Sequence, residues 1–298
     1  MSDRHGRFAW YELLTTDMVA AKSFYGRVVG WEAKNEAASF PYAVFSTGGT
    51  EIGGLMELPP DARRMGAMPR WVGYVEVDDI DGAVGRLKRL GGSVLVPPTD
   101  SNIGRVSIVA DAQAATFGLV TGLKRGEAEE EPEKSGQVGW HELLAADGKM
   151  AFAFYSELFG WQQPAPREND PLETYQLIAT GGRTFGGMFP KLPRVPVPFW
   201  LYYVEVDDIT NAVAHVKEGG GRVVQGPMEL TGGGWIARCI DPQGAMFSLQ
   251  GKTSQTGIEA ASTSELDWAA EWGGFSSRGK VVARPKTADR RKPNREVK

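Results

Sequence analysis

The side chains of this chain that are candidates for binding or catalysis occur as pairs, each made of an aromatic ring and a carboxylate two positions apart. Four such pairs are present: Trp10 and Glu12, Tyr74 and Glu76, Trp140 and Glu142, and Tyr203 and Glu205. In a β-strand, residues two apart project from the same face, so each pair is predicted to share one surface. Rings with a few polar groups suit a flat organic ligand, and the carboxylates would favour a cationic one.

Glu142 is the one candidate for a catalytic residue. If the neighbouring rings raise its pKa, this carboxyl could act as a general acid or base. The alternative is structural, because rings on a half-covered sheet often only pack, and Glu76 and Glu205 lie at strand ends, where solvated acids are common. His141 has an apolar-facing position and is predicted to pack rather than to act as a base or ligand.

The sequence segments that contain these pairs occur in two similar copies. Tyr74 to Ile80 reappears letter for letter at Tyr203 to Ile209, and the pattern that begins at Asp111 returns at Asp241. A self-match held over a whole period indicates two copies of one domain. The predicted boundaries are domain 1 at 6–123, a charged linker at 124–136, domain 2 at 137–251 and a low-complexity basic tail at 252–298.

Within each copy, strands are predicted to alternate with amphipathic helices. Apolar residues one turn apart give the helices a buried face, and glycines end them. In copy one the expected strands are 8–14, 41–46, 51–58, 71–77, 93–96, 104–110 and 115–121, and the expected helices are 18–29 and 80–90. This order predicts an α+β fold with two βαβββ-type units per domain.

The composition is that of an ordinary globular chain. Of the 298 residues, 42% are apolar and 23% are charged, with a formal net charge of −4. No apolar run approaches the roughly 20 residues that span a bilayer, and the amino terminus lacks a secretory signal, so a cytoplasmic protein without membrane contact is expected. Cys239 is the only cysteine, which excludes an intramolecular disulfide and a thiolate metal cluster.

The tail differs in character from the rest of the chain. From Arg278 to Lys298 it holds nine Lys or Arg residues against two acids. We expect a disordered segment that docks electrostatically on the acidic body of the protein. The alternative is a tether for nucleic acid, which is disfavoured because no aromatic residues are interleaved with these charges.

Several motifs recur in a fixed order. They are Phe24-Tyr25 and Gly30-Trp31 in the first helix of copy one, Phe154-Tyr155 and Gly160-Trp161 in copy two, Val206-Asp207-Asp208 before a second helix, and Asp241-Pro242-Gln243-Gly244 before a last strand. This order resembles the vicinal oxygen chelate superfamily, which includes glyoxalase I, bleomycin-resistance proteins and extradiol dioxygenases. The resemblance implies strands curled into an open cup whose floor holds a divalent metal.

The resemblance also implies four strand positions per domain that supply metal ligands from His, Gln and Glu. In this chain the positions fall on Trp10, on or beside Glu57, on Val72 and about Gly118, and then on Trp140, near Pro190, on Leu201 and about Ser248. At most one carboxylate remains, so no metal site and no cofactor are predicted. The residues predicted to bind a ligand are Trp10, Glu12, Glu57, Tyr74, Trp140, Glu142, Tyr203 and Glu205.

Two functions from different classes follow. The favoured one is a metal-free protein of the bleomycin-resistance kind that binds or sequesters a small organic molecule, aromatic or cationic, in an aromatic-lined cup. The alternative is a glyoxalase- or dioxygenase-like enzyme whose divalent metal is held by a displaced set such as Glu12, Glu57, Glu76 or Glu142. A third is an interaction module whose basic tail recruits a partner. The protein is expected to be a monomer or a homodimer.

Overall fold

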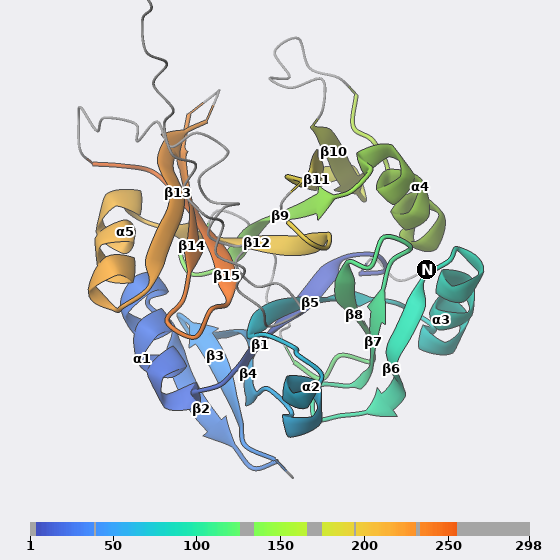
Figure 1. Ribbon diagram of the computed structural model, residues 1–298, viewed down its shortest axis with the longest axis horizontal. Helices are drawn as coiled ribbons and strands as arrows, with labels where there is room; N and C mark the ends of the chain where they lie inside the picture. The colour runs from blue at the N-terminus through green and yellow to red at the C-terminus, as the bar shows by residue number, and fades with distance from the viewer. Residues whose placement is uncertain are drawn as a thin grey trace, which may run out of the picture.

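The structure is a computed structural model that describes residues 4–38, 40–125, 134–165, 175–193, 195–230 and 233–254 (Figure 1). Two tandem domains follow the two sequence repeats, and each is built on one curled sheet, so the predicted α+β fold is confirmed. The expected basic tail lies outside the described residues except for 252–254, as does the linker from 126 to 133.

Domain 1 contains two βαβββ units in one eight-stranded sheet. Its elements are β1 (Phe8–Thr15), α1 (Met18–Val29), β2 (Glu32–Glu36), β3 (Tyr42–Thr47), β4 (Thr50–Glu57), α2 (Pro60–Arg64), β5 (Arg70–Glu76), α3 (Ile80–Arg89), β6 (Ser93–Asp100), β7 (Arg105–Ala110) and β8 (Thr116–Thr121). The strand order is β2-β3-β4-β1-β5-β8-β7-β6. Strands β1 and β5 lie side by side at the centre and pair antiparallel, which joins the two units.

Domain 2 repeats this plan. Its elements are β9 (Val138–Ala145), α4 (Gly148–Phe159), β10 (Gln176–Thr180), β11 (Arg183–Pro190), β12 (Phe199–Val206), α5 (Ile209–Glu218), β13 (Arg222–Glu229), β14 (Trp235–Ile240) and β15 (Met246–Gly251). The strand order is β10-β11-β9-β12-β15-β14-β13. Among the described residues, the counterpart of β2 is reduced to a single bridge between Gln162 and Ala179.

Two elements of domain 1 were not expected from the sequence. Strand β2 reads Glu-Ala-Lys-Asn-Glu and is largely exposed, so it carries no apolar alternation, and it forms only because the edge of β3 offers backbone partners. The short helix α2 lies inside the segment 59–69 that reads as a loop, and Pro60 at its first turn supplies a preset backbone angle.

The first helix of each domain has matching caps. Asp17 accepts hydrogen bonds from the backbone of Val19 and Ala20, and Asp147 accepts one from Met150. Gly30 and Gly160 end the helices with φ of 74° and 75°, a left-handed conformation that favours glycine. None of the helices in the described ranges is long and apolar enough to cross a membrane.

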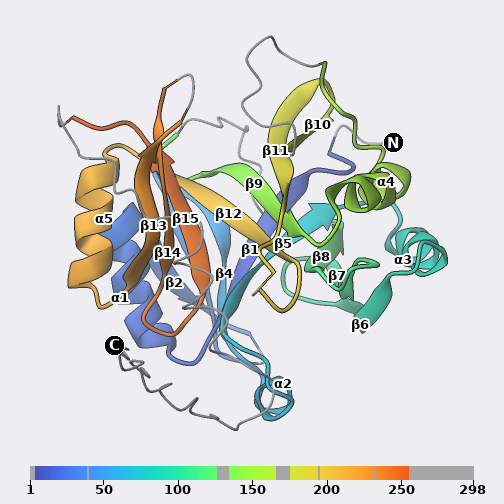
Figure 2. The ribbon, with the colours of Figure 1, turned by 45° about the horizontal axis from the view of Figure 1, so that its top comes forward.

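The two domains pack back to back. Both ribbon views place α1 beside α5 and α3 beside α4, so each pair joins helices of different domains (Figure 1, Figure 2). One buried cluster combines α3 and β8 with α4 and β11, and a second combines α1 and β3 with α5 and β15. The convex backs of the sheets therefore form a shared core, and the concave faces look away from it.

The repeated aromatic motifs serve this contact between domains. Tyr25 in α1 donates a hydrogen bond to Asp241 of domain 2 at 3.1 Å, and Tyr155 in α4 donates to Asp111 of domain 1 at 3.0 Å. Two tryptophans make a second reciprocal pair of contacts. The indole of Trp31 donates to the backbone carbonyl of Gly136, just before the first strand of domain 2, at 2.6 Å, and the indole of Trp161 donates to that of Gly6, just before the first strand of domain 1, also at 2.6 Å. The duplication is thus expressed as a pseudo-twofold pair.

Candidate ligand-binding cups

The concave face of domain 1, here called the first cup, is filled by its own side chains. Its buried lining consists of Trp10, Tyr42, Val44, Val72, Tyr74, Ile103 and Val120. Glu12 lies among them with 6% of its surface exposed and accepts hydrogen bonds from the hydroxyls of Tyr42 at 2.8 Å and Tyr74 at 2.6 Å. Burial raises the pKa of Glu12, and these tyrosine donors oppose that shift only in part.

The concave face of domain 2, here called the second cup, holds a charged cluster instead. Glu142 accepts a hydrogen bond from Tyr203 at 2.8 Å and forms an ion pair with Arg238 Nη2 at 2.6 Å. The same guanidinium donates from Nε to the Tyr203 hydroxyl at 3.2 Å and from Nη1 to Gln225 Oε1 at 2.6 Å. Arg238 therefore organises three polar side chains from three strands.

Neighbouring strands explain why only the second cup has this cluster. Arg238 on β14 corresponds to Ile108 on β7, and Gln225, its partner across β13 and β14, corresponds to Val96, the partner of Ile108. The polar pair of domain 2 is therefore an aliphatic pair in domain 1. Glu142 is compensated by a cation, whereas Glu12 accepts hydrogen bonds from neutral tyrosine hydroxyls.

Aromatic rings and one hydroxyl complete the second cup. Trp140 donates to the Tyr175 hydroxyl at 2.9 Å. Together with Trp140, the half-buried rings of Phe189 and Phe199 pack against the buried apolar cluster that contains Leu201 and Tyr203. The Ser248 side chain is fully buried on β15, and among the described residues its hydroxyl has no hydrogen-bond partner. A buried hydroxyl without a partner costs free energy, and a hydrogen bond from a bound ligand or water would remove that cost.

The structure places most of the predicted site residues in the cups. Trp10, Glu12 and Tyr74 meet in the first cup, and Trp140, Glu142 and Tyr203 meet in the second. Whether they bind a ligand stays a prediction.

Glu57 lies outside the first cup, and its role in ligand binding stays a prediction. Strand alternation puts it on the same side as Leu55, which packs in the core between the domains, and its side chain is exposed; Met56 is the residue that faces the first cup. Glu205 is half-buried near the end of β12 and accepts a hydrogen bond from Gln250.

Four residues of the cups were not identified from the sequence, namely Tyr42, Tyr175, Gln225 and Arg238. A fifth, Ser248, was considered only as a metal-ligand position and not as a polar contact for a ligand. Arg238 could have been found, because it stands between Ile236 and Ile240 on the same face of a short apolar strand. An arginine at such a buried position needs an acidic partner. The others follow from strand pairing, which the sequence does not display.

The donor atoms of the proposed displaced metal site do not converge. Glu12 and Glu142 lie in different cups, Glu57 is exposed on the opposite face, and Glu76 pairs with Arg4 at 3.5 Å. Across the described ranges, no group of three or more His, Cys, Asp or Glu side chains is arranged to hold an ion. Since Arg238 already occupies the Glu142 carboxylate, the residues present do not fit the divalent metal that the fold implies.

His141 lies outside the cups, in the contact between the domains. It is buried, with its ring Nε2 2.6 Å from the hydroxyl of Tyr11 and its Nδ1 3.0 Å from the carbonyl oxygen of Phe185. Burial lowers the pKa of His141 to about 4, so the ring is neutral at pH 7. It then donates from Nδ1 to the carbonyl and accepts from Tyr11, which agrees with the packing role expected from the sequence.

Two stretches of the chain, residues 7–117 and 137–249, match the Glyoxalase/Bleomycin resistance protein/Dioxygenase superfamily. The chain belongs to this superfamily, and the resemblance in the sequence motifs is confirmed. The order of βαβββ units and the two curled sheets agree with this assignment.

Particular relatives cover most of the chain. "Putative glyoxylase CFP32" of Mycobacterium bovis is 32% identical over 251 residues, which is 83% of this chain and 95% of that protein. "Anthracycline biosynthesis protein DauV" of Streptomyces sp. strain C5 is 28% identical over 266 residues, 82% of this chain and 92% of that protein.

Solved structures share the fold at lower identity. The Mn(II)-bound glyoxalase from Novosphingobium aromaticivorans superimposes with a TM-score of 0.60 at 14% identity, covering 84% of this chain and 83% of that one. Homoprotocatechuate 2,3-dioxygenase from Brevibacterium fuscum gives a TM-score of 0.57 at 12% identity, covering 85% of this chain and 73% of that one. These likenesses support the architecture alone.

Proposed function

We propose that the protein binds a small organic molecule in the second cup, and that this molecule carries an aromatic ring and an oxygen acceptor. The observation that carries the proposal is the cluster of Arg238, Glu142, Tyr203 and Gln225 in domain 2, which the equivalent cup of domain 1 lacks. Because the two cups share one fold, this difference is not required by the architecture.

The energetic argument concerns the buried ion pair. Taking Arg238 and Glu142 out of water costs free energy that their attraction returns only in part, and apolar replacements of such pairs are often equally stable. In the first cup the position equivalent to Arg238 is occupied by an aliphatic residue, Ile108. Apolar residues at these positions would also be compatible with the fold, so the charged cluster suggests a binding role. In that role the guanidinium would donate to a ligand oxygen.

The remaining lining suggests the class of ligand. Half-buried Trp140, Phe189 and Phe199 offer rings against which a planar molecule can stack, and the Ser248 hydroxyl supplies a polar contact at the floor. The similarity to proteins named for anthracycline biosynthesis supports a polycyclic, oxygen-bearing aromatic compound.

A cationic ligand, which the carboxylates alone would favour, has less support in the second cup. Arg238 lies 2.6 Å from Glu142 and neutralises its charge. An incoming ammonium group would therefore meet a guanidinium beside the carboxylate that should attract it. We propose a neutral or anionic aromatic molecule instead.

The test is a titration of the full-length protein with a hydroxylated anthraquinone, followed by quenching of tryptophan fluorescence and by calorimetry. We expect saturable binding at one site per chain. Ser248→Ala and Arg238→Gln should each weaken binding by about tenfold or more, because each removes a polar contact inside a desolvated cup. The control in the first cup is Glu12→Gln, at the position equivalent to Glu142, and this variant should bind like the wild-type protein.

Two results would contradict the proposal. Binding that is weakened by Glu12→Gln but not by Ser248→Ala would move the site to the first cup. Absence of saturable quenching, in a protein whose circular dichroism and unfolding transition are normal, would remove the aromatic ligand class.

A further inference from the structure

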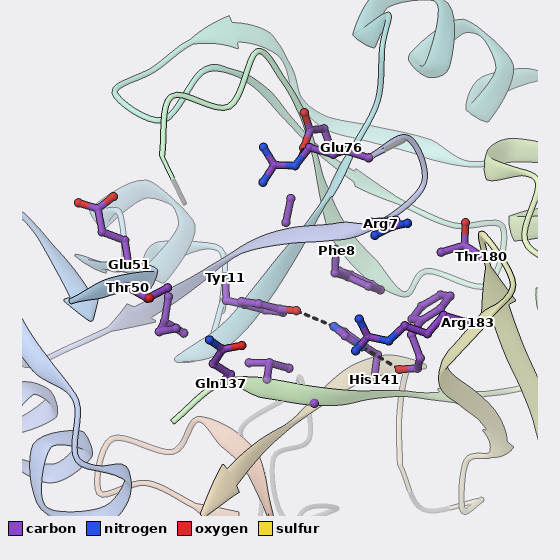
Figure 3. A pocket seen from close by; sticks show the side chains of 16 residues that line it. Arg7, Phe8, Tyr11, Thr50, Glu51, Glu76, Gln137, His141, Thr180 and Arg183 are labelled. Atoms are coloured by element: carbon purple, nitrogen blue, oxygen red, sulfur yellow. Dashed lines mark hydrogen bonds and ion pairs between the residues drawn. The ribbon is translucent and has the colours of Figure 1, made fainter. Parts of the chain in front are cut away.

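A cavity of about 130 Å³ lies between the two domains, on the side of the sheets away from both cups. Domain 1 lines it with the segment that leads into β1 and with the start of β4, and domain 2 lines it with the start of β9 and with the turn between β10 and β11 (Figure 3). A cavity of about 150 Å³ accommodates a benzene molecule, so this one has room for about one ring.

The centre of the cavity is aromatic. The ring of Phe8 stacks on the imidazole of His141 with centroids 4.4 Å apart, and Tyr11 points its hydroxyl at the same imidazole (Figure 3). Tyr11 and His141 hold equivalent positions in the two repeats, so the cavity lies where the pseudo-twofold axis passes between the domains. Phe185 adds a fourth ring to the lining.

The charged groups of the lining are unequal in number and in position. Three arginines, Arg4, Arg7 and Arg183, accompany two acids, Glu51 and Glu76, so the lining has an excess of one positive charge. Both acids form ion pairs, Glu76 with Arg4 and Glu51 with Arg125 at 3.2 Å. Figure 3 shows these two carboxylates at the edges of the group, whereas Arg183 lies beside His141.

The imidazole itself adds no charge. His141 is neutral at pH 7, since burial is the main cause of its low pKa and the charge of Arg183 lowers that pKa further. The positive charge of the described lining therefore comes from arginine side chains. A guanidinium beside aromatic surface is a suitable recognition group for a carboxylate attached to a ring.

We propose that this cavity is a second binding site, distinct from the cups, for a small carboxylate that carries one aromatic ring. The ring packs among Phe8, Tyr11 and Phe185, and the carboxylate accepts hydrogen bonds from the guanidinium of Arg183. Because residues of both domains close the site, the bound anion also links the domains. This inference does not depend on the second cup being a binding site.

The experiment uses benzoate and the full-length protein. Calorimetry should show one benzoate per chain, and the ring resonances of His141 should shift; the chain has only three histidines, so His5→Gln and His215→Gln assign them. Arg183→Gln should weaken binding by about tenfold or more, and benzamide, which lacks the charge, should bind weaker by a similar factor. Arg89→Gln, at an exposed arginine of α3, is the matched control and should bind normally.

A second variant keeps the test decisive if Arg183→Gln affects folding. Ala9→Leu fills the cavity from the lining side without removing a polar group and should abolish the shift of the His141 resonances. Three results would each overturn the proposal: no binding at about 10 mM benzoate, equal binding of benzamide, or displacement of benzoate by the hydroxylated anthraquinone. The last would place both molecules in one site.

Discussion

Glu12 and Glu142 hold the same place in the two repeats, yet their carboxyl groups meet different chemistry. Two tyrosine hydroxyls donate to Glu12, and its pKa is raised because burial disfavours the ionised form. Glu142 is held by Arg238 and Tyr203. A buried carboxyl can stay neutral and satisfied, but a buried guanidinium has no neutral form at ordinary pH and needs its partner.

Removal of the two carboxylates should therefore have unequal costs. We expect Glu142→Gln to lower the free energy of unfolding by about 3 kcal/mol, since it leaves Arg238 buried without a counter-charge. Glu12→Gln should change it by less than about 1 kcal/mol, because the amide oxygen can accept from one tyrosine hydroxyl and the amide NH2 can donate to the other. Urea unfolding of both variants at pH 7 measures the difference. Equal losses would show that Arg238 is not dependent on Glu142.

Among the strands, β5 of domain 1 meets β12 of domain 2 where the two sheets pack together. Gly73 of β5 faces the ring of Tyr202, and its backbone N–H donates to the Tyr202 hydroxyl at 2.7 Å. A Cβ atom at Gly73 would lie 2.7 Å from that ring. Gly73 and Tyr202 occupy equivalent positions in the two repeats. The missing side chain of Gly73 in domain 1 therefore leaves the space that the ring of Tyr202 from domain 2 fills.

This pairing predicts a strong effect of one added methyl group. Gly73→Ala should destabilise the protein by about 2 kcal/mol, because the ring of Tyr202 is packed on all sides and cannot withdraw. Combination with Tyr202→Ala should remove most of that additional cost. The matched control is Gly85→Ala in α3, where the new Cβ meets only the end of Arg89; it should stabilise the protein by about 0.5–1 kcal/mol.

Thermal unfolding of the two single variants and of the double variant provides the comparison. A cost of Gly73→Ala that persists unchanged beside Tyr202→Ala would mean that the two side chains do not compete for this space.

For the molecule as a whole, the hydrogen bond between Tyr11 and His141 lies where the two repeats face each other, and with a neutral imidazole the tyrosine hydroxyl is the donor. The pKa of His141 is about 4 in the folded protein, below its ordinary value of 6.5. The unfolded chain therefore binds more protons between these values, and stability is lost as the pH falls from 6.5 towards 4.

We expect this histidine to remove roughly 3 kcal/mol of stability between pH 7 and pH 4. The measurement compares wild-type protein with His141→Gln, which can accept from Tyr11 and does not titrate. The variant should lose less stability over this interval, whereas His215→Gln, at a half-buried surface position of α5, should follow the wild-type curve. Contributions from Glu12, Asp111 and Asp241, whose pKa values burial raises, cancel in the comparison.

The duplication, most of the strand and helix order, and the face on which Trp10, Glu12, Trp140 and Glu142 project could be predicted from the amino-acid sequence. These properties are local or periodic, because alternation along a strand and a repeated motif can be read without knowing which strands are neighbours. Strand β2 escaped this reading because an exposed edge strand carries no alternation.

The contacts between side chains, in contrast, could be identified only in the folded protein. Arg238 reaches Glu142 from a strand far along the chain, and Tyr42 on β3 reaches Glu12 on β1 although β4 lies between these two strands in the sheet. The cavity between the domains exists only because two convex sheet backs pack together, and its lining comes from both halves of the chain. Sheet register and domain packing fix such contacts, and both depend on residues distant in sequence that must fit in three dimensions.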